Sequence, residues 1–376
     1  MNDSIEPFTI AVPQKDLDDL HARLAHTRWP EPLPDTGWER GMPVTELREL
    51  ADYWRAGYDW RAAEAGLNCY PQFVTTIDAQ RIHFLHVRAE RPDAIPLLIT
   101  HGYPSSVAEF LHLIDPLVHR DDGPAFDVIA PSLPGYAFST PLNDTGWAMA
   151  RTARAWAELM RRLGYQRYGV HGGDVGAGVS GMVAAFDAEH VIGMHVVTDP
   201  ITAANVATFI PGTSDRSDPH DTVDKIILDR MDEFRREGSG YLAIQNSRPN
   251  TIGYGLLDSP ALQLAWIAEK VHEWTDLPVE RDQLLTTVSL YWFTGCGASV
   301  AHTLYDQAHA TDWAPAGAVP QGFAVFGADE TARKLVPAQP AAHWTEYPHG
   351  RHFPAMEAPD DLAADLRAFF FSLVPG

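Results

Sequence analysis

The stretch from Tyr168 to Ser180 reads YGVHGGDVGAGVS and places one carboxylate, Asp174, in a glycine-rich turn after an apolar run. A sharp turn from a strand into a helix that presents a nucleophile needs small residues two positions before and two positions after it, because the flanking backbones crowd each other. Gly172 and Gly176 meet this need. The stretch therefore indicates a nucleophilic aspartate. The alternative is an aspartate that caps a helix starting near Val175.

Composition restricts the classes of partner. The chain has 376 residues, with 50 acidic and 28 basic side chains and a net charge of −22. Such a charge opposes binding to nucleic-acid phosphates and to anionic membrane surfaces, so we expect a neutral small molecule as partner. The two cysteines, Cys69 and Cys296, lie far apart and support neither a disulfide framework nor a zinc site.

The sequence gives no sign of export or membrane insertion. The N-terminus lacks a basic region followed by an apolar one, and no segment approaches the roughly 18 apolar residues that a membrane span requires. We expect a cytoplasmic protein, and the sequence leaves open whether it forms a homodimer.

Short β-rich runs alternate with helical patterns in the middle of the chain, which predicts an α/β fold with a doubly wound, mostly parallel sheet. We expect a lid-like extension with two amphipathic helices over 1–72, a first part of the α/β core over 73–200, a helical cap over 201–317 and a second part of the core over 318–376. The strands are expected at 73–77, 81–87, 96–102, 126–132, 168–173, 193–199 and 323–327.

A carboxylate nucleophile needs a base, a third group that orients the base, and donors for an oxyanion. Asp329 follows the strand at 323–327, and His352 lies just before the closing helix at 361–373. The chain order is therefore nucleophile, acid, histidine. His349 is the alternative histidine, and a metal site on His349 and His352 lacks further ligands nearby.

The oxyanion donors are expected at two backbone amides. His101-Gly102-Tyr103-Pro104 directly follows the strand that begins at Pro96. This proline-fixed turn can point the Tyr103 amide at the same place as the Val175 amide, and two donors are the usual number. The alternative is an ordinary tight turn.

The ordered series of motifs resembles that of microsomal-type epoxide hydrolases, within the α/β-hydrolase superfamily. The similar segments are PFTIAVPQKDLDDLHARLAHTRWP at 7–30, HGYPSS at 101–106, PSLPGYAFS at 131–139, HGGDVG at 171–176, GYLAIQNSRPNTIGYGLLDSPALQLAWIAEK at 240–270, LYWFTG at 290–295 and RHFPAMEAP at 351–359. The resemblance implies an α/β-hydrolase fold with a helical cap. It also implies hydrolysis of an epoxide to a vicinal diol through an ester on Asp174, without a cofactor.

The resemblance further implies two cap tyrosines that donate hydrogen bonds to the epoxide oxygen. The first corresponds to Tyr241. The second falls at Tyr305, one residue beyond the position that counting from Tyr291 would give, which is Leu304. Tyr254 is the reserve candidate.

Two other functions share part of this pattern. A haloalkane dehalogenase has the same nucleophile and triad order, but it usually binds halide through an indole N–H on the residue after the nucleophile, which Val175 lacks. A catalytically silent binding protein of the same fold is the second alternative.

Aromatic side chains indicate the substrate class. Trp147, Phe138, Trp266 and Trp292 are the candidates for lining the pocket. If they line it, they favour an aromatic or polycyclic epoxide as substrate; the alternative is that they pack in the core. A natural-product epoxide is a separate expectation that does not depend on these residues.

Overall fold

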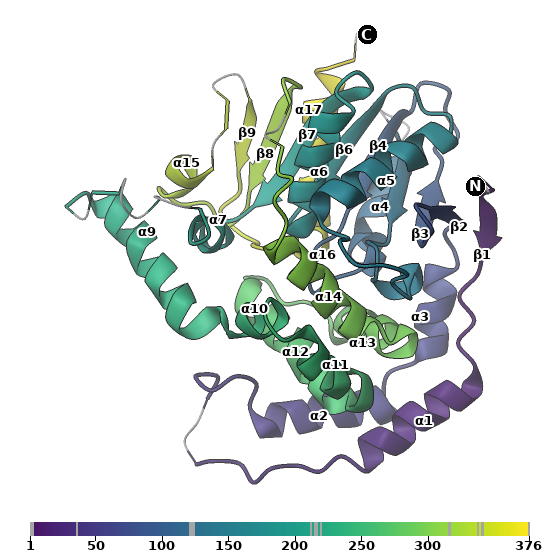
Figure 1. Cartoon of the computed structure of the whole chain (residues 1–376), viewed down its shortest axis with the longest axis vertical. Coiled ribbons are helices and arrows are strands. Elements are labelled where there is room, and N and C mark those ends of the chain that lie inside the picture. The colour runs from purple at the N-terminus through teal and green to yellow at the C-terminus, as the bar shows by residue number, and fades with distance from the viewer. Residues whose placement is uncertain are drawn as a thin grey trace.

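A mixed sheet runs through the computed structural model, which describes residues 4–34, 37–119, 125–210, 213, 217–218, 220–314, 317–336, 338–339 and 342–374. Within these residues the sheet has nine strands in the order β1-β2-β3-β5-β4-β6-β7-β8-β9 (Figure 1). The strands are β1 Glu6–Phe8, β2 Gln72–Ile77, β3 Gln80–Val87, β4 Ile95–Thr100, β5 Phe126–Pro131, β6 Tyr168–Gly172, β7 Val191–Thr198, β8 Gln321–Val325 and β9 His343–Glu346.

Strands β5, β4, β6, β7, β8 and β9 pair in parallel, whereas β1, β2 and β3 add antiparallel strands at one edge. This arrangement confirms the expected α/β-hydrolase fold with a mostly parallel sheet. Strand β4 lies between β5 and β6, so the chain proceeds outward from β4 in both directions. Ligands of such sheets bind at the carboxyl ends of the strands beside this switch point.

Two helical layers cover the sheet because successive residues of a strand face opposite sides. In β4, Leu98 joins one hydrophobic cluster together with Trp156, while Leu97 and Ile99 join a second cluster together with Phe370. Helices α5 Met149–Arg162 and α6 Val175–Phe186 pack on the first face, and α4 Leu111–Val118 and α17 Pro359–Phe371 pack on the second (Figure 1).

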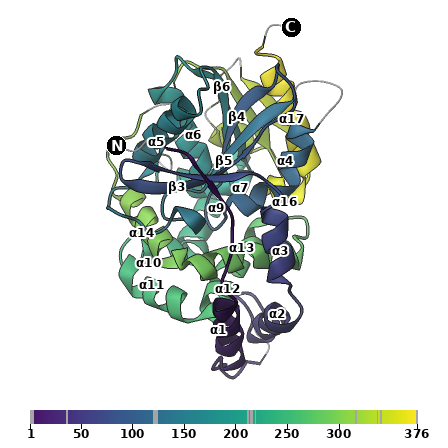
Figure 2. The same ribbon diagram turned by 90° about the vertical axis from the view of Figure 1, so that its right-hand side faces the viewer.

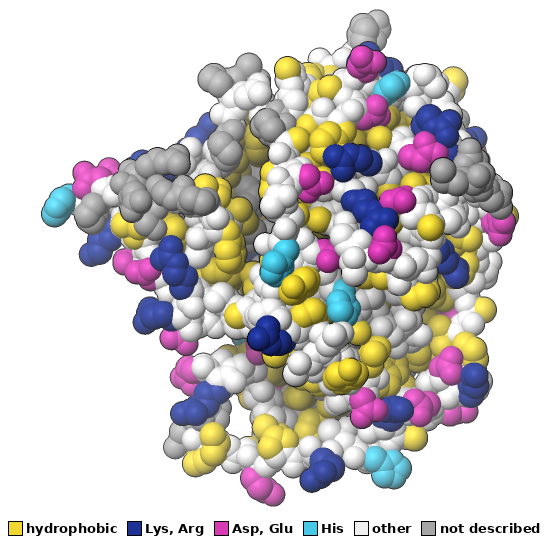
Figure 3. Space-filling view, in the orientation of Figure 1, with side chains coloured by type: hydrophobic (Ala, Val, Ile, Leu, Met, Phe, Trp, Pro, Cys, Tyr) yellow, Lys and Arg dark blue, Asp and Glu magenta, His cyan; other side chains and the backbone are white. Residues whose placement is uncertain are grey.

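Between β7 and β8 the chain is helical and forms a cap at the carboxyl ends of the strands (Figure 1). Helix α9 packs against α7 and projects to one side of the molecule (Figure 1), and Figure 3 shows a recess between this projection and the main body. The cap helices are α7 Pro200–Ala207, α9 Thr222–Glu233 with a π-helical turn at Phe234–Gly238, α10 Gly240–Gln245, α11 Pro249–Asp258, α12 Pro260–Trp274, α13 Arg281–Thr294 and α14 Cys296–Ala308.

The N-terminal segment joins the edge of the sheet to the outer side of the cap. It contains the two expected helices, α1 Gln14–Ala25 and α2 Val44–Ala56, and also β1 and α3 Trp60–Leu67, which the sequence patterns did not predict. Helices α1 and α2 lie against α12 at the end of the molecule opposite the sheet (Figure 2). The buried Trp54 indole donates a hydrogen bond of 2.9 Å to the Ser289 hydroxyl on α13, which ties this segment to the cap.

Among the described residues no single helix is long and apolar enough to cross a membrane. The sharply bent pair of α13 and α14 meets that test only when the two helices are taken together, and only by length and composition.

Candidate active site

Asp174 occupies the sharp turn between β6 and α6, with φ 52° and ψ −127°. The turn is possible because its glycines leave no side chain in the way: a Cβ on Gly176 would lie 1.9 Å from the carbonyl oxygen of Thr100. The Asp174 side chain makes no capping hydrogen bond to α6. The local geometry is therefore that of a presented carboxylate, and the helix-cap alternative does not describe it.

The loop after β4 supplies a backbone donor to this carboxylate. The N–H of Tyr103 donates a hydrogen bond of 2.8 Å to Oδ1 of Asp174. Gly102 permits this approach, because a Cβ there would lie 2.4 Å from Cβ of Asp174. Val175 is the first residue of α6, so its N–H is among the groups at a helix N-terminus that have no partner within the helix. Both predicted oxyanion donors thus lie next to Asp174.

His352 lies on the other side of the carboxylate. Its Nε2 is 3.6 Å from Oδ2 of Asp174, and its side chain is only 6% exposed. The N–H of His352 donates to the carbonyl oxygen of Trp274 on α12, and the Trp274 indole packs against the imidazole ring. His349 instead lies near the surface, with its Nε2 2.7 Å from Oδ2 of Asp361. The structure therefore brings His352, and not His349, to the Asp174 carboxylate.

The Nδ1 side of His352 differs from the sequence expectation. Nδ1 is 2.8 Å from the Thr202 hydroxyl and 3.8 Å from Oδ2 of Asp199, a carboxylate at the end of β7. Asp329, the expected partner, instead accepts hydrogen bonds from the Arg230 guanidinium and from Thr331. The structure does not bring Asp329 and His352 together, because a cation on α9 holds the Asp329 carboxylate.

Two acidic residues near His352 were missed by sequence reasoning. Asp199 follows a buried strand and precedes Pro200 at the start of a helix, a signal that resembles an ordinary helix cap. Glu109 lies in the short 3₁₀-helix Val107–Phe110 and is buried. Burial raises the pKa of Glu109 to about 7, with the charge of Asp174 acting in the same direction.

The charges around His352 stabilise its protonated form. Burial alone would lower the pKa of His352, but the Asp199 carboxylate near Nδ1 and the negative charges of Asp174 and Glu109 raise it overall. Burial would likewise raise the pKa of Asp199, yet the interactions with His352 and Thr202 lower it. The pair can therefore hold an imidazolium beside a carboxylate within the protein.

Tyr241, at the start of α10, lies in the site as expected. Its ring stacks on that of Tyr103, with centroids 5.6 Å apart, and also packs against Trp274. Burial, followed by the negative charge of Asp174, raises the pKa of Tyr241 well above its usual value. The phenol is therefore protonated at neutral pH and close enough to respond to the charge of the nucleophile.

Tyr305 does not occupy the expected place. Its ring stacks on that of His309, with centroids 4.1 Å apart, while Leu304 lines the cavity beside Val175. Tyr254, the reserve candidate, is 75% exposed. Neither of these tyrosines is part of the site.

A largely apolar cavity adjoins the elbow, and one further tyrosine, Tyr136, lines it. Burial, and then the charge of Asp174, raises the pKa of Tyr136 well above its usual value. Tyr136 is therefore one of several phenols whose pKa the charge of Asp174 raises. The cavity is lined by Leu133, Pro134, Tyr136, Trp147, Met149, Thr152, Val175, Val179, Thr303, Leu304 and Gln307.

Of the four aromatic residues expected to line the pocket, only Trp147 does so. Phe138 packs against Phe8 of the N-terminal strand, and Trp292 lies under the guanidinium of Arg23 on α1. Trp266 packs against the hydrophobic cluster that contains Tyr103. Three of these rings therefore do not line the cavity, because the packing of the N-terminal segment and the cap engages them elsewhere.

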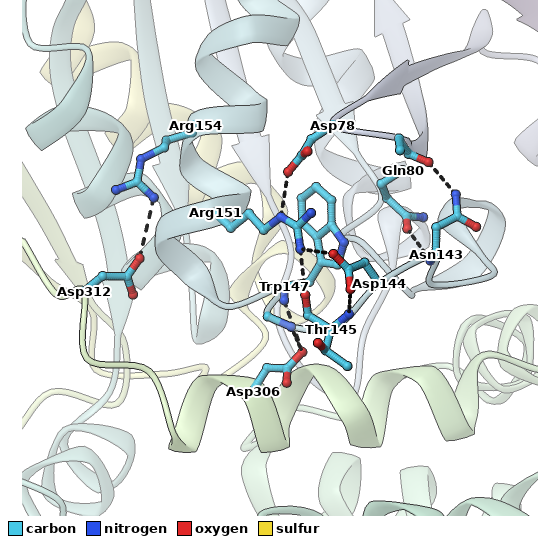
Figure 4. Close-up of polar contacts among 12 residues, drawn as sticks. Asp78, Gln80, Asn143, Asp144, Thr145, Trp147, Arg151, Arg154, Asp306 and Asp312 are labelled. Carbon is cyan, nitrogen blue, oxygen red and sulfur yellow. Dashed lines mark hydrogen bonds and ion pairs between the residues drawn. The ribbon is translucent and has the colours of Figure 1, made fainter.

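The cap is fixed to the core beside this cavity (Figure 4). Oδ2 of Asp306, near the end of α14, accepts hydrogen bonds from the backbone N–H groups of Gly146, at 2.6 Å, and Trp147, at 3.1 Å. The guanidinium of Arg151 lies 4.2 Å from the centre of the Trp147 ring and pairs with Asp78. These contacts hold α14 and the Trp147 loop together, which places Leu304 and Trp147 in one cavity wall.

Two known protein families match the parts of the chain that carry the Tyr103 loop and the Asp174 elbow. The family described as "Epoxide hydrolase N terminus" matches residues 5–110, and the family described as "alpha/beta hydrolase fold" matches residues 95–235. The first match includes the loop that carries Tyr103, and the second includes the elbow that carries Asp174.

Similarity to individual proteins extends over almost the whole chain. A Stigmatella aurantiaca protein named "Putative epoxide hydrolase" is 40% identical over 98% of this chain and 85% of its own length. Epoxide hydrolase 1 of Sus scrofa is 32% identical over 98% of this chain and 89% of its own length. The crystal structure of juvenile hormone epoxide hydrolase from Bombyx mori superimposes with a TM-score of 0.86 at 30% identity, covering 98% of this chain and 95% of that one.

Proposed function

The chain belongs to the microsomal-type epoxide hydrolase family, and we propose that it converts an epoxide and water to a vicinal diol through an ester on Asp174. One observation carries the catalytic assignment: the Tyr103 N–H holds Oδ1 of Asp174 at 2.8 Å, while Oδ2 lies 3.6 Å from Nε2 of His352. The Tyr103 N–H therefore fixes Oδ1 of Asp174, whereas Oδ2 faces the imidazole of His352, which can act as a base. This arrangement suits a nucleophile whose ester is later attacked by water.

In the first step a carboxylate oxygen of Asp174 attacks one epoxide carbon as the bond from that carbon to the epoxide oxygen breaks. The departing alkoxide is a poor leaving group and needs a proton. We assign this donation to Tyr241, with Tyr136 in the place that Tyr305 was expected to fill. Their positions support the assignment: the Tyr241 ring stacks on that of Tyr103, whose N–H holds Asp174, and Tyr136 lines the cavity beside Val175.

In the second step His352 takes a proton at Nε2 from a water molecule, whose oxygen attacks the ester carbonyl carbon of Asp174. The amides of Tyr103 and Val175 stabilise the resulting oxyanion. Collapse breaks the bond between the carbonyl carbon and the product oxygen, and the departing diol takes the proton from His352. The proton left on the Asp174 carboxyl returns to the phenolate formed in the first step. Epoxide and water have then become diol, and the enzyme is restored.

The cavity favours an apolar epoxide. Leu133, Met149, Val179 and Leu304 contribute aliphatic surface, and Trp147 contributes an aromatic face. Val175 and Leu304 carry no side-chain hydrogen-bonding group, so recognition there depends on burial of apolar surface. We therefore propose substrates in which the epoxide carries an aryl or alkyl group.

Styrene oxide is a suitable probe of this function. The wild-type protein should form the diol, Asp174→Ala should form none, and His352→Gln should accumulate an adduct with the mass of the protein plus one substrate. His349→Gln is the matched control, because that surface histidine lies in the same segment and pairs with Asp361. Full diol formation by Asp174→Ala would contradict the assignment of the nucleophile.

A further inference from the structure

Two carboxylates lie at positions from which a side chain could orient the imidazole of His352. Asp199 and Asp329 follow neighbouring parallel strands, β7 and β8, at the same edge of the sheet. Either position could supply an acid to a histidine that approaches from the loop before α17. Which carboxylate serves is decided by side-chain contacts, and the two residues differ sharply in theirs.

Asp199 has one oxygen committed to a helix and one directed at the site. Its Oδ1 accepts hydrogen bonds from the N–H groups of Ile201, at 2.9 Å, and Thr202, at 3.0 Å, at the start of α7. Its Oδ2 is buried, has no hydrogen-bond partner among the described residues and lies 3.8 Å from Nδ1 of His352. A buried carboxylate oxygen without a donor is costly unless a positive charge develops beside it.

Thr202 completes the arrangement around Nδ1. Its hydroxyl lies 2.8 Å from Nδ1 of His352. The hydroxyl can accept the N–H at Nδ1, which leaves Nε2 as the unprotonated nitrogen that faces Asp174. Helix α7 therefore sets the tautomer of His352 through Thr202, and the carboxylate that caps the same helix compensates the charge when Nε2 gains a proton.

Asp329 is fully engaged elsewhere. Its Oδ2 accepts a hydrogen bond of 2.6 Å from the Arg230 guanidinium on α9, and its Oδ1 accepts hydrogen bonds from the N–H and the hydroxyl of Thr331. Arg230 also donates to the Thr331 hydroxyl. These contacts connect the outlying helix α9 to the loop after β8.

We propose, on the basis of the hydrolytic function above, that Asp199 with Thr202 is the positioning pair of His352, and that Asp329 is an anchor for α9. Asp199 touches neither the substrate nor the reacting atoms, and it acts through the imidazole. Its removal should therefore spare the attack of Asp174 on the epoxide and slow only the hydrolysis of the ester.

Single-turnover measurements with styrene oxide separate the two carboxylates. Asp199→Asn and Asp199→Ser should alkylate at nearly the wild-type rate but hydrolyse the ester about 1000-fold more slowly, so that the adduct accumulates in intact-mass spectra. Both substitutions retain a side chain that can cap α7, which preserves folding. Asp329→Asn is the matched control, and it should hydrolyse the ester within a few-fold of wild type.

A titration of the His352 ring by NMR gives a readout that does not depend on turnover. Asp199→Asn should lower the pKa of His352, whereas Asp329→Asn should leave it unchanged. The inference is overturned if Asp329→Asn traps the ester or lowers the pKa of His352 while Asp199→Asn behaves like wild type. If wild-type protein forms neither adduct nor diol, the proposed hydrolytic function fails, while the titration still decides which carboxylate faces His352.

Discussion

Replacing Glu109 with glutamine should raise the free energy of unfolding much more at pH 8 than at pH 5. Glu109 is buried, with 7% of its surface exposed, and lies in the 3₁₀-helix that follows the Tyr103 loop. Burial disfavours its charged form and raises its pKa from 4.5 to about 7. Glutamine keeps the shape and the hydrogen-bonding capacity but carries no charge at any pH.

The sign and size of the effect follow from proton binding. Between these two pKa values the unfolded chain releases its proton while the folded protein keeps it, so the contribution of Glu109 to stability falls as the pH rises. With values of 4.5 and about 7, the fall between pH 5 and pH 8 amounts to about 2.5 kcal/mol. Other groups that titrate in this range are common to both proteins, and those that do not interact with Glu109 cancel in the difference.

Urea unfolding of wild type and Glu109→Gln at the two pH values measures this difference directly. Glu49→Gln, on the exposed face of α2, is the control for replacement of a glutamate by glutamine at the surface. If the stability difference between wild type and Glu109→Gln is the same at pH 5 and pH 8, the pKa of Glu109 is not raised in the folded protein, and the reasoning fails. Because the charge of Glu109 also raises the pKa of His352, Glu109→Gln should shift the acid limb of the kcat profile to lower pH.

Two further predictions concern the cavity and the elbow. Tyr136→Phe should slow ester formation from styrene oxide about 100-fold through loss of a proton donor, whereas Tyr305→Phe should have little effect. Rapid-quench kinetics measure both rates. A large loss of rate in Tyr305→Phe with little loss in Tyr136→Phe would identify Tyr305 as the donor. Gly176→Ala should destabilise the protein by about 2 kcal/mol or more, because its Cβ would lie 1.9 Å from the Thr100 carbonyl oxygen. Gly66→Ala, where nothing lies within 4 Å of the new Cβ, is the control for thermal unfolding, and an equal Tm for the two variants would refute the clash.

Local features of the sequence were sufficient to predict the turn that carries Asp174 and the fold class. The glycines around Asp174 and the run before them describe a strand, a turn and a helix within a few residues, so no distant contact is needed to recognise them. The alternation of strands and helices similarly predicts the parallel sheet. His352 could be selected because it directly precedes the closing helix, which the apolar pattern locates.

The sequence could not identify the second tyrosine of the site, because which residue of α14 faces the cavity depends on the rotation of that helix about its axis. Leu304 and Tyr305 are adjacent on α14, and adjacent residues of an α-helix are about 100° apart around its axis. The contacts of Asp306 with the backbone of the Trp147 loop fix that rotation, so Leu304 lines the cavity and Tyr305 stacks on His309. Counting residues from a motif cannot supply this angle.

The sequence by itself determined the Asp174 elbow, the Tyr103 loop and the choice of His352, because each belongs to a short segment with its own conformational signal. Only the tertiary structure decided which carboxylate lies near Nδ1 of that histidine. Asp199 and Asp329 both end strands of the same sheet, and the choice rests on Arg230, which α9 brings to one of them and not to the other. Such a contact between residues about a hundred positions apart leaves no periodic trace in the sequence, because it depends on how the cap packs over the core.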